Sequence, residues 1–454
     1  MHTSDNKSTH PAIKAPYGVI FFLLLGLLAQ TEAQTPLRKA WLGVLSHPVD
    51  AGIQVDSVVN ESTFAALSLQ KGDIIESING RQTSTQEAYY EVAGQLRTGD
   101  AVKVAYTRNG KAAESSGTAV MRPFESAPDA YVLYDWVKFR NGYLRTMTWR
   151  PKTGDHLPCI LLIPGYGCGS IENYSASYNG KLIAEWVKNG YAVVAIEKSG
   201  VGDSDGCAPC NEVDLRTDIE SFDAGYKFME KLPFADKDRL FIWGHSMGGT
   251  IAPEVARRHS PRGVMVFACV FRPWSEFLLE MHRVQKPLME NLTYRQTEDF
   301  VRGIQKIYYE FFRLKKTPAQ LHEIPEYRPL VESEMGYAEG NDQMWGRHWR
   351  FWQQLDSVNL AQSWQEVNCP VLVLHGGADY EQCSLVEPLM IQKTVNEAHP
   401  GMATCVTIPD LDHFMMKSAD WQEAYAHFRD RQYLKGNFNG RIAEATLSWL
   451  SEFL

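Results

Sequence analysis

The chain of 454 residues lacks the features that mark several broad classes of protein. It has no collagen-like period, no long low-complexity tract and no block of like charge, which excludes fibrous and wholly disordered proteins. Basic residues are outnumbered by acidic ones, 45 against 54, and the net charge is −9. Because non-specific binding to nucleic acid depends on basic clusters, nucleic acid is not expected as a partner. The 44% hydrophobic content instead predicts folded cores, in about two to three domains.

Long apolar runs are also scarce, and the one candidate lies near the N-terminus. The run from Val19 to Ala29 is too short to cross a bilayer comfortably, since a spanning helix needs about 20 residues. Two lysines precede it and a short stretch ending at Ala33 follows. This order predicts a secretory signal peptide, residues 1–33, with an uncleaved anchor as the alternative. We therefore expect a secreted or periplasmic protein whose mature chain has no stable membrane span.

Residues 35–123 have the sequence pattern of a small, mainly β domain. Short apolar stretches alternate with turn signals such as Asn79-Gly80 and Asn109-Gly110, and one helix-like stretch follows Thr85. The module resembles PDZ domains of the kind attached to bacterial proteases. The resemblance rests on Trp41-Leu42-Gly43-Val44, on Gln70-Lys71-Gly72-Asp73-Ile74-Ile75 and on Ile78-Asn79-Gly80-Arg81.

In PDZ domains an extended peptide adds a strand to an open sheet edge, and its carboxylate sits on the N–H groups of the first loop. The resemblance therefore implies that a polypeptide C-terminus binds at the loop formed by Trp41, Leu42, Gly43 and Val44. The alternative is a spacer that binds nothing or docks on its own second domain.

Residues 130–454, which follow a proline-marked linker, alternate buried strand-like runs with amphipathic stretches. The runs include CILLIP, YAVVAIE, RLFIW, VMVFACVF and VLVLH. Continuous apolar strands separated by helical crossovers predict a mainly parallel sheet that is covered on both faces. We expect an α/β, doubly wound domain whose sheet begins with an antiparallel hairpin near residues 131–149.

The sequence Gly244-His245-Ser246-Met247-Gly248 fits the pattern G-x-S-x-G. Alone this pattern is weak, but here it follows a strand-like run, 239–243, and opens a helical stretch, 249–258. A strand, a sharp turn and a helix in that order predict a nucleophile elbow with Ser246 as the nucleophile. A serine hydroxyl also needs a base that removes its proton.

The base and its acid partner follow in the order that this fold requires. Asp379 lies just after the strand VLVL, and His413 lies after the next strand-like run. We predict a catalytic triad of Ser246, Asp379 and His413, in which the aspartate holds the imidazole tautomer. We expect His245 to point away from the serine and His375 to be structural. Asp412 is expected to cap a turn or to face solvent.

An oxyanion hole requires two donors aimed at the tetrahedral intermediate. We expect one to be the backbone N–H of Met247, the residue after the nucleophile. The other should come from the loop after CILLI, where the backbone N–H of Tyr166 is the best candidate and its phenol could assist. Glycines at 165, 167 and 169 suit a loop that brings backbone close to a substrate.

Residues 130–454 resemble the α/β-hydrolase superfamily, nearest its serine aminopeptidase-like and dienelactone hydrolase-like bacterial members. Besides the elbow, the resemblance rests on the glycine loop Glu197 to Ser204, on Gly376-Gly377-Ala378-Asp379 and on Asp412-His413-Phe414. The oxyanion loop of this family commonly begins with His-Gly, but here it begins with Pro164-Gly165. The resemblance also implies that the segment at about 273–365, which has no strand signal, is a helical cap over the site.

Helices are expected in the cap at Trp274–Arg283, Thr297–Leu314 and Gln343–Leu355. Its many aromatic residues are more typical of a core than of a substrate pocket. Arg272, Arg347 and Arg350 could bind a substrate carboxylate, but solvated charges are the simpler interpretation.

The eight cysteines contain one C-x-x-C pair, Cys207 and Cys210. A single pair without nearby histidines is poor evidence for zinc, and no metal or other cofactor is expected. Export would permit disulfides. Because the two loops leave adjacent predicted strands, Cys168 could pair with Cys210 or Cys207 across the mouth of the site.

These features predict an exported serine hydrolase that cleaves an ester or amide of a small molecule through an acyl-enzyme. Ester cleavage is favoured, because nothing in the cap identifies a peptide amine or carboxylate site. The alternatives are a peptidase that acts on peptides presented by the PDZ-like domain, and a catalytically inert PDZ scaffold.

Overall fold

The computed structural model describes residues 37–172, 174 and 177–453. The predicted signal peptide, residues 1–33, lies outside these residues. Within the part of the chain that is described, none of the helices has the length and apolar character that crossing a bilayer requires.

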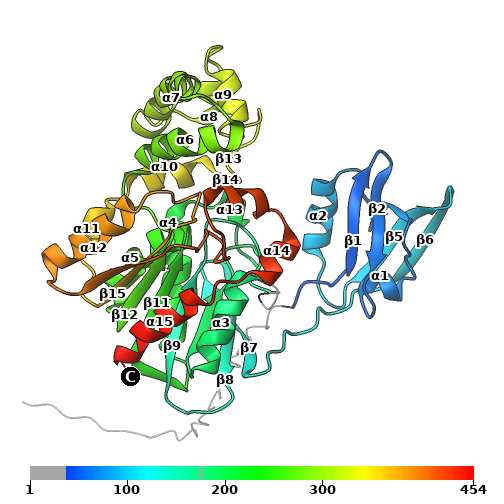
Figure 1. Ribbon diagram of the computed structural model, residues 1–454. Helices are drawn as coiled ribbons and strands as arrows, with labels where there is room; N and C mark the ends of the chain where they lie inside the picture. The colour runs from blue at the N-terminus through cyan, green and yellow to red at the C-terminus, as the bar shows by residue number, and fades with distance from the viewer. Residues whose placement is uncertain (1–36, 173, 175–176, 454) are drawn as a thin grey trace, which may run out of the picture. The chain divides into compact units, whose positions relative to one another are not determined.

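The first sheet is small and antiparallel (Figure 1). Its strands are β1 (Val44–Val49), β2 (Gly52–Val58), β3 (Ile74–Ile78), β4 (Arg81–Gln82), β5 (Ala101–Arg108) and β6 (Lys111–Thr118). They are ordered β1-β2-β3-β5-β6, with β4 paired to β3, so β1 lies at an edge. The tight turn between β5 and β6 is made by Asn109 and Gly110, which both have positive φ.

Two helices, α1 (Thr63–Ala66) and α2 (Gln86–Gln95), accompany this sheet. The helix predicted after Thr85 is α2, and the Thr85 side chain caps it by accepting from the N–H of Ala88. Alternate residues of the strands, among them Ile53, Val55 and Ile75, form one apolar core with Phe64 of α1.

The second sheet is larger and has eight strands. These are β7 (Ala130–Phe139), β8 (Gly142–Pro151), β9 (Leu157–Ile163), β10 (Ala192–Ile196), β11 (Ala235–His245), β12 (Gly263–Phe267), β15 (Val371–Gly376) and β16 (Ala403–Ile408). Their order is β16-β15-β12-β11-β9-β10-β8-β7. The hairpin β7–β8 and the β8–β10 pair are antiparallel, and the remaining pairs are parallel. The predicted α/β class, mainly parallel with an initial hairpin, is confirmed.

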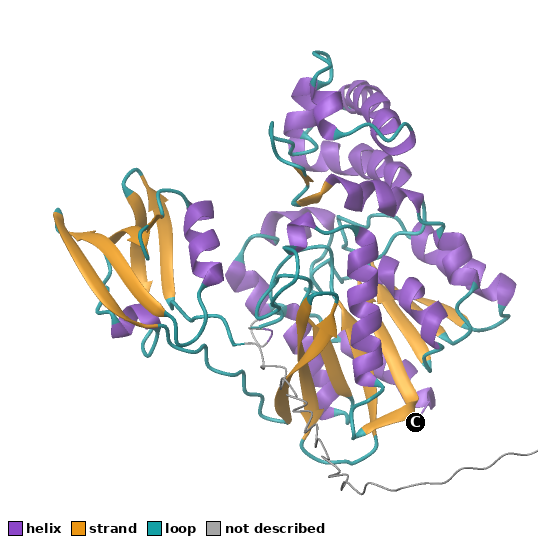
Figure 2. Cartoon of the chain, turned by 180° about the vertical axis from the view of Figure 1, so that it is seen from behind, coloured by secondary structure: helices purple, strands orange, loops and turns teal. Residues whose placement is uncertain are grey.

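Helices cover both faces of this sheet (Figure 2). They are α3 (Tyr178–Lys188), α4 (Leu215–Met229), α5 (Met247–His259), α12 (Val386–Ala398) and α15 (Arg441–Leu450). Successive residues of a strand point to opposite faces, so Leu161 packs in the core beneath α4, α5 and α12, whereas Ile160 and Leu162 pack beneath α3 and α15. Burial on both faces explains the continuous apolar runs in the sequence.

Residues 268–370, which we call the insertion, separate β12 from β15. It contains α6 (Trp274–Glu290), α7 (Tyr294–Tyr308), a π-helical turn (Tyr309–Arg313), α8 (Pro318–His322), α9 (Arg328–Ser333), α10 (Trp349–Ser357) and α11 (Leu360–Gln365). The first two predicted helices are present, but the third prediction was wrong at its start. There β13 (Gln343–Met344) and β14 (Arg347–His348) form a hairpin, because Trp345 and Gly346 adopt positive φ and cannot continue a helix.

Candidate active site

Residues 244–248, which we call the elbow, form the turn from β11 into α5. Ser246 has φ 56° and ψ −125°, a sparsely populated backbone conformation that surrounding structure must hold. A Cβ at Gly244 would overlap the carbonyl oxygen of Gly248, and a Cβ at Gly248 would overlap that of Ile163. Both glycines of the motif are therefore required by close backbone packing.

Ser246 lies in the wall of a cavity of about 390 Å³. Most of the lining is apolar or aromatic, and the insertion supplies much of it. Lining residues include Trp274, Phe277, Leu278, Met281, Met289, Trp345, Trp352, Tyr380, Tyr425 and Phe428. Aromatic residues of the insertion thus serve two purposes, since Tyr308, Phe311 and Phe312 are buried in the core, whereas the three tryptophans face the cavity.

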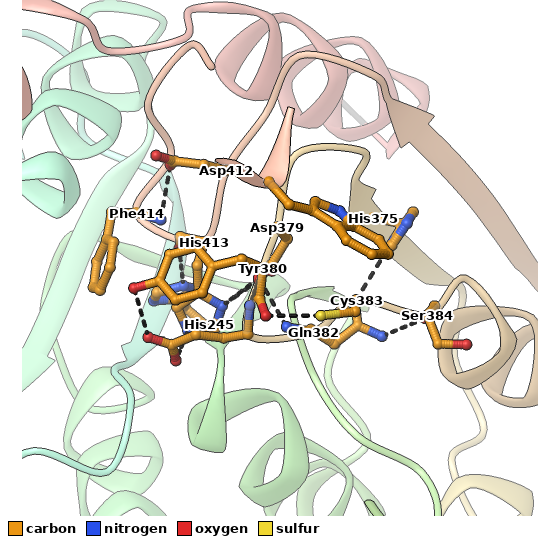
Figure 3. Close-up of polar contacts among 12 residues, drawn as sticks. His245, His375, Asp379, Tyr380, Gln382, Cys383, Ser384, Asp412, His413 and Phe414 are labelled. Carbon is orange, nitrogen blue, oxygen red and sulfur yellow. Dashed lines mark hydrogen bonds and ion pairs between the residues drawn. The ribbon is translucent and has the colours of Figure 1, made fainter. Parts of the chain in front are cut away.

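Asp379 and His413 come into direct contact beyond the carboxyl ends of the strands (Figure 3). Asp379 follows β15 and His413 follows β16, so both lie beyond the carboxyl ends of parallel strands. The Nδ1 atom of His413 is 3.0 Å from Oδ2 of Asp379. Both residues are buried, and Asp379 also accepts the backbone N–H groups of Glu381 and Gln382. These contacts fix the carboxylate and leave Nε2 as the outward nitrogen of the imidazole.

The electrostatics of the pair favour a charged histidine. Burial opposes the charged form of His413, but the negative charges of Asp379 and then Glu381 outweigh it and raise the histidine's pKa to about 9. Burial likewise works against an ionised Asp379, yet the facing histidine and the hydrogen bonds hold the pKa of that carboxyl below its usual value.

Glu381 is a site residue that the sequence analysis missed. One of its carboxylate oxygens lies 3.3 Å from Nε2 of His413, and the residue lines the cavity beside Ser246. Among the described residues, no hydrogen bond joins Ser246 Oγ to His413. Glu381 thus contacts the nitrogen that would serve the serine. No sequence signal could have found it, because an acidic residue in a loop is usually a solvated charge.

Three other residues that could have been assigned to the triad make hydrogen bonds around His413 instead: His245, His375 and Asp412. Nε2 of His245 donates to the backbone oxygen of His413 at 2.9 Å, and burial, followed by the charge of His413, lowers the pKa of His245 to about 3. The Nδ1 atom of His375 is 3.1 Å from Gln382. Asp412 is buried, not solvent-facing, and it accepts the N–H groups of Phe414 and Met416.

Residues 164–169, which we call the oxyanion loop, follow β9 and pass beside Ser246. A Cβ at Gly165 would lie 3.4 Å from the Cβ of Ser246, so loop and nucleophile are in close proximity. Met247 is the first residue of α5, where a backbone N–H has no partner within the helix. The Tyr166 phenol packs edge-on against Trp352, with ring centroids 5.6 Å apart, and is partly exposed.

The three arginines that could have been solvated charges behave differently. Arg347 is fully buried and its guanidinium is 2.9 Å from Asp218, so the interpretation as a solvated charge was wrong there. Arg272 forms ion pairs with Glu280 and Glu387. Arg350 is exposed and lies over the ring of Trp349. None of the three lines the cavity.

Cys168 of the oxyanion loop and Cys210 are joined by a disulfide, one of the two pairings considered from the sequence. Cys207 is free, and its thiol faces the backbone oxygens of Phe139 and Tyr143. Within the described ranges, no group of three or more His, Cys, Asp or Glu side chains is placed to hold a metal ion.

The predicted peptide-binding loop, Trp41, Leu42, Gly43 and Val44, leads into edge strand β1. Its carbonyl groups are used, since Trp41, Leu42 and Gly43 accept the N–H groups of Thr63, Phe64 and Val59. Gly43 has φ 67°, and a Cβ there would overlap Ser62. Strand β1 lies at an edge of its sheet, the arrangement in which a peptide can add a strand.

Comparison with known families gives two matches. A family model described as serine aminopeptidase, S33, matches residues 159–420, which is more than half of the chain. A model of the PDZ domain matches residues 40–116.

Individual relatives are distant. The chain is 27% identical to the quorum-quenching protein AidA of Acinetobacter baumannii over 123 residues, which are 27% of this chain and 38% of that protein. It is 20% identical to esterase EstD of Thermotoga maritima over 215 residues, 47% of this chain and 43% of EstD. Each match thus spans less than half of the relative. Among solved structures, Est1E from Butyrivibrio proteoclasticus shows a TM-score of 0.44 and 14% identity, covering 70% of this chain and 98% of its own.

Proposed function

The chain belongs to the serine aminopeptidase, S33, family of hydrolases, and we propose that it is a serine hydrolase that cleaves a carboxylic ester through an acyl-enzyme on Ser246. The observation that carries the proposal is the strained elbow at Ser246 in the wall of a cavity that it shares with His413. Strain of this kind persists only where the structure over-determines it, and it occurs most often at functional sites.

In the proposed reaction, Oγ of Ser246 forms a bond to the ester carbonyl carbon while Nε2 of His413 takes the hydroxyl proton. The carbonyl oxygen becomes an oxyanion, which the N–H groups of Met247 and Tyr166 bind. When the intermediate collapses, the bond to the alcohol breaks and the alcohol takes the proton from His413. Water then repeats the sequence on the acyl-enzyme and releases the acid. Asp379 keeps the imidazole oriented throughout.

The cavity indicates the substrate class. Its lining is dominated by aromatic and aliphatic side chains, and among the described residues that line it, only Glu381 and Arg429 carry charge besides His413. A bulky, neutral and apolar acyl or alcohol group would bury the most surface there. We therefore expect aromatic or branched esters to be better substrates than short esters.

A peptidase is the second candidate, because the edge strand β1 could present a polypeptide end. It predicts cleavage of peptides with apolar side chains and a gain in rate when their C-terminus can reach the PDZ domain. Secretion or a periplasmic location, through the predicted signal peptide, would give either enzyme its substrates outside the cytoplasm.

The test is labelling with a fluorophosphonate probe, followed alongside hydrolysis of p-nitrophenyl esters. Ser246→Ala should abolish both signals. Ser260→Ala is a matched control, since Ser260 stands at the other end of α5, also with positive φ, and is exposed. Folded wild-type protein that neither labels nor turns over would overturn the proposal and favour the inert PDZ scaffold.

A further inference from the structure

Two buried cations bind the backbone of the oxyanion loop. Nζ of Lys198 donates to the carbonyl oxygen of Gly165 at 2.6 Å and to that of Gly167 at 3.1 Å. Nη1 of Arg347 donates to the carbonyl oxygen of Tyr166 at 2.8 Å. Three consecutive carbonyl groups of the loop are thus held by positive charge.

Both cations share one buried carboxylate. Oδ2 of Asp218, in the first turn of α4, is 2.9 Å from Arg347 and 3.7 Å from Lys198. The exposed fractions of Lys198, Asp218 and Arg347 are 3%, 0% and 0%. Solvent therefore does not screen the cluster. A buried cluster of charges costs desolvation energy that well-packed apolar residues would avoid, so its place under this loop calls for a functional reason.

The geometry of the peptide bond supplies that reason. In a trans peptide unit the C=O and the following N–H point in opposite directions. The carbonyl of Gly165 and the N–H of Tyr166 belong to the same unit, so a cation on that oxygen fixes the direction of the N–H. A positive charge at the oxygen end also strengthens the N–H as a donor, because hydrogen bonds that are linked in series polarise one another.

We propose that Lys198, anchored by Asp218, is a positioning residue that aims and strengthens the Tyr166 N–H of the oxyanion hole, and that Arg347 steadies Tyr166 from its other side by holding the carbonyl of the following peptide unit. This inference rests on the proposed serine mechanism. Arg347 belongs to the insertion, in β14, whereas Lys198 follows β10 and Asp218 lies in α4. The cluster therefore couples the insertion that lines the cavity to the donor that stabilises the transition state. Neither cation lines the cavity.

The test uses Lys198→Met, which removes both contacts to the loop and leaves the Arg347–Asp218 pair in place. Its matched control is Lys393→Met, at a lysine that is 78% exposed on α12. The readouts are kcat and KM for a p-nitrophenyl ester and the affinity for two ketones of the same shape. A trifluoromethyl ketone forms a tetrahedral adduct with an oxyanion on the serine, and its methyl ketone counterpart mimics the substrate ground state.

We expect Lys198→Met to lower kcat about 10- to 100-fold, since loss of a whole oxyanion donor costs about 10²- to 10³-fold. Affinity for the trifluoromethyl ketone should fall by a similar factor, while KM and the methyl ketone affinity change less than about twofold. Lys198→Arg should recover part of the loss. Equal loss for both ketones, or no loss of kcat, would overturn the positioning role.

Should Lys198→Met fail to fold, Arg347→Lys carries the test. It keeps a charge beside Asp218 but removes the fork that reaches the Tyr166 carbonyl, so we expect a smaller split between the two ketones in the same direction. An equal loss for both ketones would contradict the proposal. Failure of the proposed function itself looks different, because wild-type protein would then show no turnover that depends on Ser246.

Discussion

The elbow and the oxyanion loop meet beside Ser246, and both are rich in glycine, yet they are held by different means. In the elbow, a Cβ at Gly244 or Gly248 would overlap neighbouring backbone. In the oxyanion loop, a Cβ at Gly167 or Gly169 would meet none of the described residues within 4 Å. The elbow is thus fixed by steric contact between adjacent elements, whereas the loop is fixed by a disulfide and by buried charges from distant segments.

The largest effect should come from breaking the elbow with Gly248→Ala. The added methyl group would overlap the carbonyl oxygen of Ile163, at the point where the oxyanion loop begins. Because backbone on both sides must move, we expect a loss of about 3 kcal/mol or more in the free energy of unfolding. Fluorophosphonate labelling should fall to the level of Ser246→Ala. A folded and active Gly248→Ala protein would contradict the steric account; denaturant titration checks the first part.

A smaller effect is expected when the histidine is misoriented while elbow and loop stay intact. Asp379→Asn should lower kcat about 10³- to 10⁴-fold, as the amide favours the wrong imidazole tautomer. The control is Asp412→Asn, since Asp412 is also buried next to His413 but binds backbone N–H groups instead. That variant should lose stability more than turnover. Steady-state kinetics on both proteins decide which aspartate serves the histidine.

The pH dependence tests how far a charge outside the elbow and the loop acts on the histidine. A base must be neutral to accept a proton, so with the pKa of His413 raised to about 9, the acid limb of activity should lie above pH 7. Burial lowers the pKa of Lys198 to about 8, so loss of its charge should limit the gain toward pH 9. Glu381→Gln removes a negative charge that favours the protonated imidazole. The acid limb of kcat/KM should therefore move to lower pH, by less than about one unit because Glu381 is 39% exposed. An unchanged limb would exclude Glu381 as an influence on the base.

The sequence predicts the locally determined parts of the fold well. The strand, turn and helix around Ser246 follow from glycine spacing and apolar periodicity, and the positions of Asp379 and His413 follow from strand ends in a parallel sheet. The elbow follows from neighbouring residues only, whereas the acid and the histidine also required the order in which this fold places them after the serine. The sequence analysis missed the hairpin at Trp345 and Gly346, because the positive φ values of these two residues interrupt an otherwise helical pattern.

The groups that act from a distance could not be predicted. Arg347 binds Asp218, 129 residues away, and Tyr166, 181 residues away. In the sequence it is an ordinary arginine among aromatics, and Lys198 and Glu381 are equally inconspicuous. Their roles depend on which segments the tertiary structure brings together, and a single sequence carries no signal for such pairings.

The smallest effect is expected from a glycine substitution in the oxyanion loop, which can be compared directly with the substitution in the elbow. Gly167→Ala adds the same methyl group as Gly248→Ala, but in open space and at a residue whose φ is not positive. Its carbonyl oxygen can remain on Lys198. We expect kcat within about twofold of wild type, and a free energy of unfolding unchanged or raised by about 0.4–1 kcal/mol, because alanine restricts the unfolded chain. A tenfold loss of kcat with stability preserved would mean that glycine at this position serves the substrate, and the loop would then depend on glycine as the elbow does.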